Sequence, residues 1–109
     1  MTESLPATAV VRVALLGFDP SLSAEIDALN SRQAEYLIPA IKRLPGLIHW
    51  YTGVSPDGSQ VAVSVWDSEE HAAQMDRLEE MVVVARGEVE AVVGTFTGSI
   101  VNYPISWVI

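Results

Sequence analysis

Cysteine is absent from the 109 residues of this chain, which excludes disulfides, thiolate metal ligands and cysteine nucleophiles. Basic residues are scarce, since 6 Lys and Arg stand against 14 Asp and Glu and give a formal net charge of −8. Such a chain repels a polyanion, and its only adjacent basic pair is Lys42–Arg43. We therefore expect no nucleic-acid partner. The lack of cysteine also fits a cytoplasmic location.

Long hydrophobic runs are absent as well. No apolar stretch approaches the roughly 20 residues that a membrane-spanning helix needs, so we expect no membrane span. Residues 1–8 are polar and lack the basic segment and apolar core of a secretory signal. We expect them to form a flexible segment that precedes a single domain over residues 9–109.

Motifs for several kinds of chemistry are also missing. The chain has no glycine-rich phosphate loop, no G-x-S-x-G elbow and no H-E-x-x-H helix. Asp67 and His71 have the i,i+4 spacing of two metal ligands, but no third ligand follows at a motif spacing. The sequence therefore predicts no metal site.

What the chain has in abundance is apolar side chains, which make up 50% of its residues. A single domain of this length buries only a modest core. The apolar surface that remains favours an oligomer.

The first half of the chain predicts a strand followed by a helix. Residues 9–18 are dense in Val and Leu and indicate a buried strand. Asp19 is a suitable helix cap and Pro20 suits a first helical turn. Apolar residues then recur at three- and four-residue spacing over 22–41, which is typical of one helix face. Pro39 should kink this helix or end it shortly before.

A hairpin and two more helices come next. Strands over 47–54 and 60–66 flank Ser55-Pro56-Asp57-Gly58, a strong turn signal. Asp67 and Glu70 predict a reciprocal cap on a short helix that ends near residue 76. Met81-Val82-Val83-Val84 has strand propensity, but apolar residues at helical spacing indicate a further helix over 78–96.

A last strand over 98–108 completes the order β-α-β-β-α-β, which predicts an α+β, ferredoxin-like fold with an antiparallel sheet. Pro104 cannot donate to a strand ladder, so it should lie at an edge or a bulge. Two long helices cover one sheet face only. Because both hairpin strands carry apolar residues on both faces, we expect a homodimer joined through the open face of the sheet.

Three motifs carry a family resemblance. Pro45-Gly46-Leu47 opens the second strand, Pro56-Asp57-Gly58 forms the hairpin turn, and Val65-Trp66-Asp67-Ser68-Glu69-Glu70 leads into the next helix. Together they resemble the antibiotic biosynthesis monooxygenase type of the dimeric α+β barrel superfamily. The resemblance implies a pocket between helices and sheet. It also implies the chemistry of members that oxidise polycyclic phenols or hydroquinones with molecular oxygen and no cofactor.

Two tryptophans and two histidines are the leading site candidates. By this resemblance Trp66, at the end of the third strand, and Trp50 would form apolar walls, unless Trp66 is simply a core residue. His71 or His49 would exchange a proton. The alternative for His71 is a helix histidine bonded to Asp67.

Strand alternation places His49 with Leu47 and Tyr51 on one face and Trp50 on the other, without showing which face lines the pocket. Tyr51 is a further pocket candidate, with dimer packing as the alternative for this face. In the last strand, a bulge before Pro104 would aim Asn102 or its neighbour Tyr103 into the pocket. The favoured alternative is that the two residues form a polar pair on an edge strand.

Other functions remain as alternatives. The haem-degrading relatives pair an Asn in the first strand with a later His ligand, but residues 10–18 hold no Asn and His71 follows Trp66 too soon. A non-enzymatic homodimer that binds a small ligand, or that serves only as a structural unit, fits the same fold.

Overall fold

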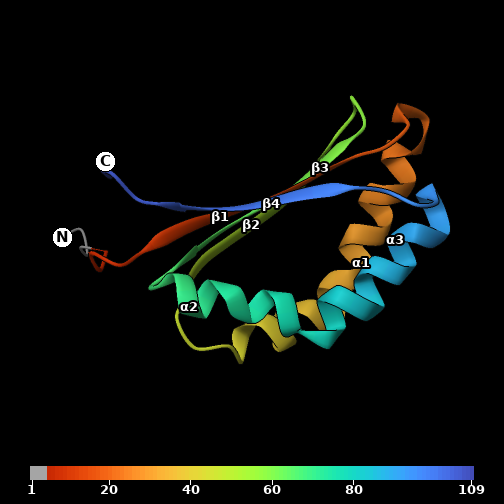
Figure 1. Ribbon diagram of the computed structural model, residues 1–109. Helices are drawn as coiled ribbons and strands as arrows, with labels where there is room; N and C mark the ends of the chain where they lie inside the picture. The colour runs from red at the N-terminus through yellow and green to blue at the C-terminus, as the bar shows by residue number, and fades with distance from the viewer. Residues whose placement is uncertain (1–4) are drawn as a thin grey trace.

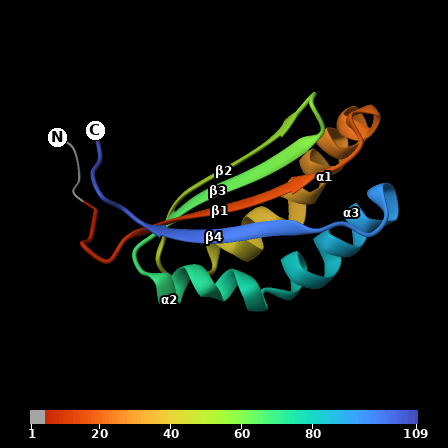
Figure 2. The ribbon, with the colours of Figure 1, turned by 45° about the horizontal axis from the view of Figure 1, so that its top comes forward.

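Residues 5–109 are described by the computed structural model, which has a four-stranded sheet with helices on one face (Figures 1 and 2). The strands are β1 (Val10–Gly17), β2 (Leu47–Ser55), β3 (Ser59–Trp66) and β4 (Gly98–Pro104). Their order is β2-β3-β1-β4, and all neighbours are antiparallel. The predicted α+β, ferredoxin-like arrangement is therefore confirmed.

In the described residues, the helical layer contains six segments of different kinds. They are a 3-10 turn (Pro20–Leu22), α1 (Ser23–Lys42), α2 (Glu69–Ala72), a second 3-10 segment (Ala73–Arg77), a π-helix (Glu80–Ala85) and α3 (Arg86–Val93). The helix predicted over residues 78–96 is thus helical for most of its length, but it begins as a π-helix. The β-branched run that gave this segment its strand propensity, Val82–Val84, lies in those wider turns.

Two apolar clusters join the helices to the sheet, one at each end. The first consists of buried Val10, Ile41, Trp66, Ala72 and Met75. The second consists of buried Ile26, Leu29 and Val89, with Phe18, Leu22, Val54 and Phe96 packed against it. Because Val10 and Trp66 pair across β1 and β3, strand alternation fixes which residues face the helices and which face outward.

Local signals in the loops are largely confirmed. Asp19 caps the 3-10 turn, since its Oδ1 accepts from the Ser21 backbone N at 2.9 Å. This hydrogen bond lowers the pKa of Asp19 below its ordinary value. In the hairpin turn, Gly58 has a φ of +93° and its N donates to the carbonyl of Ser55 at 3.1 Å, as the Pro-Asp-Gly turn predicts.

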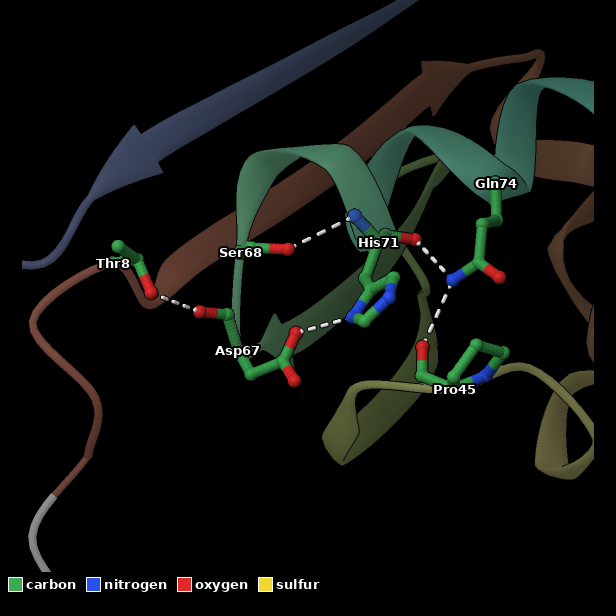
Figure 3. A network of polar contacts seen from close by, with 6 residues as sticks. All are labelled: Thr8, Pro45, Asp67, Ser68, His71 and Gln74. Carbon is green, nitrogen blue, oxygen red and sulfur yellow. Dashed lines mark hydrogen bonds and ion pairs between the residues drawn. The ribbon is translucent and has the colours of Figure 1, made fainter.

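The predicted cap at Asp67 is wrong. The N-cap of α2 is Ser68, whose Oγ accepts from the His71 backbone N at 3.1 Å (Figure 3). The chain is still held against the preceding loop at Asp67, whose N donates to the carbonyl of Gly46 at 2.9 Å. Ser68 remains extended, at φ −157° and ψ 160°, so the helix begins one residue later than the sequence indicates.

Two proline predictions have different outcomes. Helix α1 does not end before Pro39 but continues to Lys42 with the proline inside it. Strand β4 ends at Pro104, which lies on an edge strand as expected, rather than at residue 108. A proline lacks the N–H that a continued ladder needs, which accounts for the earlier end.

The segment expected to be flexible lies partly outside the described residues, which begin at Leu5. Next to it, Thr8 Oγ1 donates to the carbonyl of Asp67 at 2.7 Å (Figure 3). No helix among residues 5–109 combines the length and apolar character that crossing a bilayer requires.

Candidate functional site

A row of small side chains crosses the helix-facing side of the sheet. Ala14 of β1 pairs with Ala62 of β3 and Ile100 of β4, while Ala62 also pairs with Thr52 of β2. Residues directly opposite each other in such a ladder lie side by side on one face. Because the two central strands contribute alanines to this row, short side chains leave space between the sheet and the helices.

The space above this row is a cavity of about 890 Å³ between the two core clusters. Its walls are mostly apolar. Helix α1 contributes Ala34, Leu37, Ile38 and Ile41, and the π-helix contributes Met81, Val82 and Ala85. The volume lies within the roughly 300–1,000 Å³ of small-molecule sites in proteins. A π-helix is a rare element that is frequent at functional sites, and here it forms part of a cavity wall.

The next row across the sheet is polar. Trp50 of β2 pairs with Ser64 of β3, Ser64 with Arg12 of β1, and Arg12 with Asn102 of β4. Arg12 is only 5% exposed and borders the cavity, so it places a buried positive charge in a mostly apolar wall. Its Nη2 lies 2.6 Å from Asp76 Oδ1, and its Nη1 donates to Asn102 Oδ1 at 3.5 Å.

Two amide side chains add neutral polar groups to the wall. Gln33 of α1 is buried and its Nε2 donates to the carbonyl of Ala85 at 3.1 Å, which ties α1 to the π-helix. Gln60 of β3 donates to Asn30 Oδ1 at 3.1 Å, and both residues border the cavity. Each of these amides therefore has a partner within the protein.

A second set of hydrogen bonds joins α1 to α3. Gln33 and Tyr36 both donate to Glu88 Oε1, Gln33 at 3.2 Å and Tyr36 through its hydroxyl. Burial and the neighbouring Glu88 carboxylate raise the pKa of Tyr36 above its ordinary value, so the phenol stays protonated.

The two tryptophans have different surroundings. Trp50 borders the cavity, as the sequence analysis expects. Trp66 is fully buried at 0% exposure in the first core cluster, and its Nε1 donates to Ser64 Oγ at 2.8 Å. It does not appear in the cavity wall, which matches the alternative of a core residue.

A β-bulge changes the expected faces of β2. Leu47 pairs with Trp66 and His49 with Val65, so the register shifts between Leu47 and His49. The prediction that Leu47 shares a face with His49 is therefore wrong, because the extra residue at the bulge turns Leu47 toward the helices. Leu47 packs against the first core cluster.

His49 and Tyr51 lie on the open face of the sheet. Tyr51 pairs with Val63, is 63% exposed and does not border the cavity. Its ring centroid is 6.1 Å from that of His49. His49 also borders the cavity, because β2 is an edge strand and the cavity reaches that edge.

His71 lies outside the cavity wall, in the network of Figure 3. Its Nδ1 is 2.6 Å from Asp67 Oδ1, which matches the alternative of a helix histidine bonded to Asp67. Gln74 Nε2 donates to the carbonyl of His71 at 2.7 Å and to that of Pro45 at 2.8 Å, and thus holds α2 against the loop before β2.

Asn102 lies on the helix-facing side of β4 and contacts Arg12 rather than bordering the cavity. Its neighbour Tyr103 pairs with Val11 on the open face and is 52% exposed. The structure thus brings Trp50 and His49 to the cavity. Asn102 contacts Arg12 but does not border the cavity. The remaining candidates, Trp66, Tyr51 and His71, do not border the cavity.

Arg12 and Asp76 are the residues that sequence reasoning missed. Arg12 is the only charge in the strand over residues 9–18, and a lone charge in a buried strand needs a partner. The isolated charge of Arg12 could therefore have been recognised in the sequence. The partner lies 64 residues further along the chain, so the pair itself becomes visible only in the fold. No cluster of three or more potential metal ligands occurs among the described residues.

Searches of family models and of curated proteins find no match to this chain. Solved structures do match. A variant of SnoaB, a cofactor-independent oxygenase from Streptomyces nogalater, aligns with a TM-score of 0.65 and 18% identity over 94% of this chain and 97% of SnoaB. A monooxygenase from the gene ActVA-Orf6 of Streptomyces coelicolor, in complex with nanaomycin D, aligns with a TM-score of 0.70 and 17% identity over 94% of this chain and 92% of that protein.

A dimeric ferredoxin-like protein from an uncultured marine organism aligns with a TM-score of 0.63 and 17% identity, over 94% of this chain and 92% of its own. Other matches are provisionally named antibiotic biosynthesis monooxygenases. The resemblance to that family, indicated by the motifs in residues 45–70, is therefore confirmed at the level of the fold.

Proposed function

We propose that this protein is a cofactor-independent monooxygenase that acts on a small, flat phenol or hydroquinone with molecular oxygen. The observation that carries the proposal is the cavity of about 890 Å³, whose apolar wall contains one buried arginine. The fold likeness to a cofactor-independent oxygenase and to a monooxygenase supports the same chemistry.

In this chemistry the substrate supplies the electrons. An anthrone, for example, loses a proton, its anion reduces oxygen, and the two recombine as a hydroperoxide. Loss of water then leaves a quinone that has gained one oxygen atom, while the second oxygen atom leaves as water. The protein has to hold the ring system, favour the anion and move protons.

The residues of the cavity have roles suited to these steps. Trp50 and the apolar side chains of α1 bind the ring system. The guanidinium of Arg12 favours the substrate anion, because a buried cation interacts strongly with a developing negative charge. Asp76, 2.6 Å from Arg12 with a side chain 56% exposed, takes the proton and passes it to water. His49, at the cavity edge, is the other candidate for proton transfer.

Oxygen uptake by metal-free protein with a panel of anthrones and naphthohydroquinones tests the proposal. Ala62→Leu places a larger side chain in the floor of the cavity without removing a core contact, so uptake should fall to the rate of autoxidation. Ala24→Leu is the matched control, since Ala24 is exposed on α1 and does not border the cavity.

Uptake that survives in Ala62→Leu would place the chemistry outside this cavity. Background uptake for every compound, together with thermal stabilisation by the same compounds, would favour the alternative of a non-enzymatic ligand-binding protein. His49→Ala and His71→Ala test the two histidines as proton carriers. Loss of oxygen uptake in only one of these variants would assign proton transfer to that histidine.

We also propose that the protein is a homodimer joined through the open face of the sheet. Among residues 5–109, no helix covers that face (Figures 1 and 2). The ladder places on it the apolar side chains Val11, Val13, Leu15, Val61, Val63, Val65 and Val101. Tyr51 and Tyr103 on the same face are more than half exposed. Exposed apolar surfaces are typical of interfaces, and the likeness to a dimeric protein supports a second copy as the occupant.

A further inference from the structure

Basic residues outnumber acidic residues around the cavity, whereas acidic residues outnumber basic residues in the whole sequence. Arg12, Lys42 and Arg86 border it, and they are half of the six Lys and Arg in the sequence. Asp76 is the one acidic residue among the described residues that border it, although the sequence has 14 acidic residues. The wall is therefore net positive in a protein of formal net charge −8.

The three cations occupy different depths. Arg12 lies deepest, with a side chain 6% exposed. Lys42, at the end of α1, is exposed. Arg86, whose side chain is 51% exposed, lies over the Phe96 ring at 4.6 Å from its centroid and pairs with Glu90 at 3.2 Å. A positive rim that leads to a buried cation attracts a negative ligand, because low-dielectric walls focus the field in a cleft.

Arg12 retains hydrogen-bonding capacity. A guanidinium has five N–H donors in a planar fork that matches the two oxygens of a carboxylate. Asp76 engages Nη2, and Nη1 makes only a long bond of 3.5 Å to Asn102. Within residues 5–109 the other N–H donors of Arg12 make no hydrogen bond, so they can bind a second acceptor in the cavity.

From these observations we infer that the ligand of this cavity is an aromatic acid, whose ring system lies among the apolar side chains and whose carboxylate binds Arg12. The inference rests on the proposed function only in placing the substrate in this cavity. It narrows the substrate class from phenols and hydroquinones in general to hydroxyaromatic carboxylates. It also explains why so few of the chain's many carboxylates border the cavity.

A matched pair of probes tests the inference by binding alone. 1-Hydroxy-2-naphthoate carries the carboxylate, and its methyl ester has the same ring system without the charge. Isothermal titration without turnover should give about tenfold tighter binding of the acid than of the ester, the size expected for one charge-assisted pair. The preference should weaken as the salt concentration rises.

Four variants test which residues cause the tighter binding of the acid. Arg12→Gln should abolish it, and Lys42→Gln combined with Arg86→Gln, two exposed positions, should reduce it and its salt dependence. Asp76→Asn should tighten binding of the acid about fivefold without changing binding of the ester, since a negative charge beside the guanidinium is removed. Arg32→Gln removes an exposed cation of α1 that does not border the cavity, and should leave the preference unchanged.

Equal or tighter binding of the ester by the wild-type protein would overturn the inference, as would a preference that persists in folded Arg12→Gln. If Arg12→Gln does not fold, an Asp76→Asn protein that binds the acid no more tightly than the wild type does would overturn it instead. Because binding is measured without turnover, absence of oxygen uptake would refute the proposed reaction and leave this result standing.

Discussion

Trp66 should act as a core residue, and its truncation should cost stability. It is fully buried among Val10, Ile41 and Met75 and donates to Ser64 Oγ at 2.8 Å. Trp66→Ala should therefore lower the free energy of unfolding by about 3–5 kcal/mol, the range for truncating a large buried aromatic side chain. That is a large fraction of the roughly 5–15 kcal/mol that stabilises a typical domain.

The Trp66 hydrogen bond can be measured separately. Ser64 is 1% exposed, so Ser64→Ala leaves the buried indole N–H without its acceptor and should cost about 1–3 kcal/mol. Combining Ser64→Ala with Trp66→Phe closes a double-mutant cycle, whose coupling energy should be about 0.5–1.5 kcal/mol. Urea unfolding followed by circular dichroism, at one fixed protein concentration, gives these values.

Trp107→Ala is the control for Trp66, because Trp107 is 76% exposed and its loss should change stability by less than about 0.5 kcal/mol. The reasoning would be refuted if Trp66→Ala cost less than about 1 kcal/mol, below the core-truncation range. Loss of ligand binding at unchanged stability would instead assign Trp66 to the cavity wall.

Three further predictions concern the loops and the open face. Gly46→Ala should destabilise by about 1–3 kcal/mol in the same unfolding assay, because φ is +89° there and an added Cβ would overlap His71 Nδ1 and Asp67 Oδ1; an unchanged midpoint would contradict this. Asp19 has a lowered pKa when folded, so its contribution is complete above its ordinary value of 3.8 and declines as pH falls through and below it. The stability difference between wild type and Asp19→Ala should accordingly shrink between about pH 5 and pH 2, and a difference that grows would refute the assignment. Val63→Asp on the open face should convert a dimer to a monomer in sedimentation at micromolar concentration, whereas Val83→Asp, at a position 60% exposed on the π-helix, should not; a wild-type protein that sediments as a monomer would reject the dimer.

Local sequence signals predicted most of the fold. Asp19 and the Pro-Asp-Gly turn work through their own backbone hydrogen bonds, so their roles follow from a few neighbouring residues. The helix start at Ser68 was missed because Asp67 is equally suited to capping, and its contacts with Gly46 and Thr8 come from segments distant in the sequence. Of the two effects expected of Pro39, a kink or an earlier end, the earlier end does not occur, since α1 continues to Lys42.

The candidate site was harder to predict because it depends on register between distant strands. The floor of the cavity is a row of residues from four strands, which no single segment reveals. The bulge before His49 leaves no mark in residue types, yet it reverses the face of Leu47. The Arg12–Asp76 pair joins residues from opposite halves of the chain. His71 and Trp66 resembled site residues by their positions in the sequence. In the structure His71 contacts Asp67 and Trp66 donates to Ser64, and neither borders the cavity.

The most direct test of the central claim is to supply ¹⁸O₂ to metal-free protein with an anthrone or naphthohydroquinone substrate and to measure the mass of the product by mass spectrometry. The account predicts a product that carries one ¹⁸O atom, formed faster than by autoxidation in the wild-type protein and at the background rate in Ala62→Leu. Product formation no faster than autoxidation, or equal rates in the two proteins, would contradict the claim that this cavity carries out a cofactor-independent oxygenation.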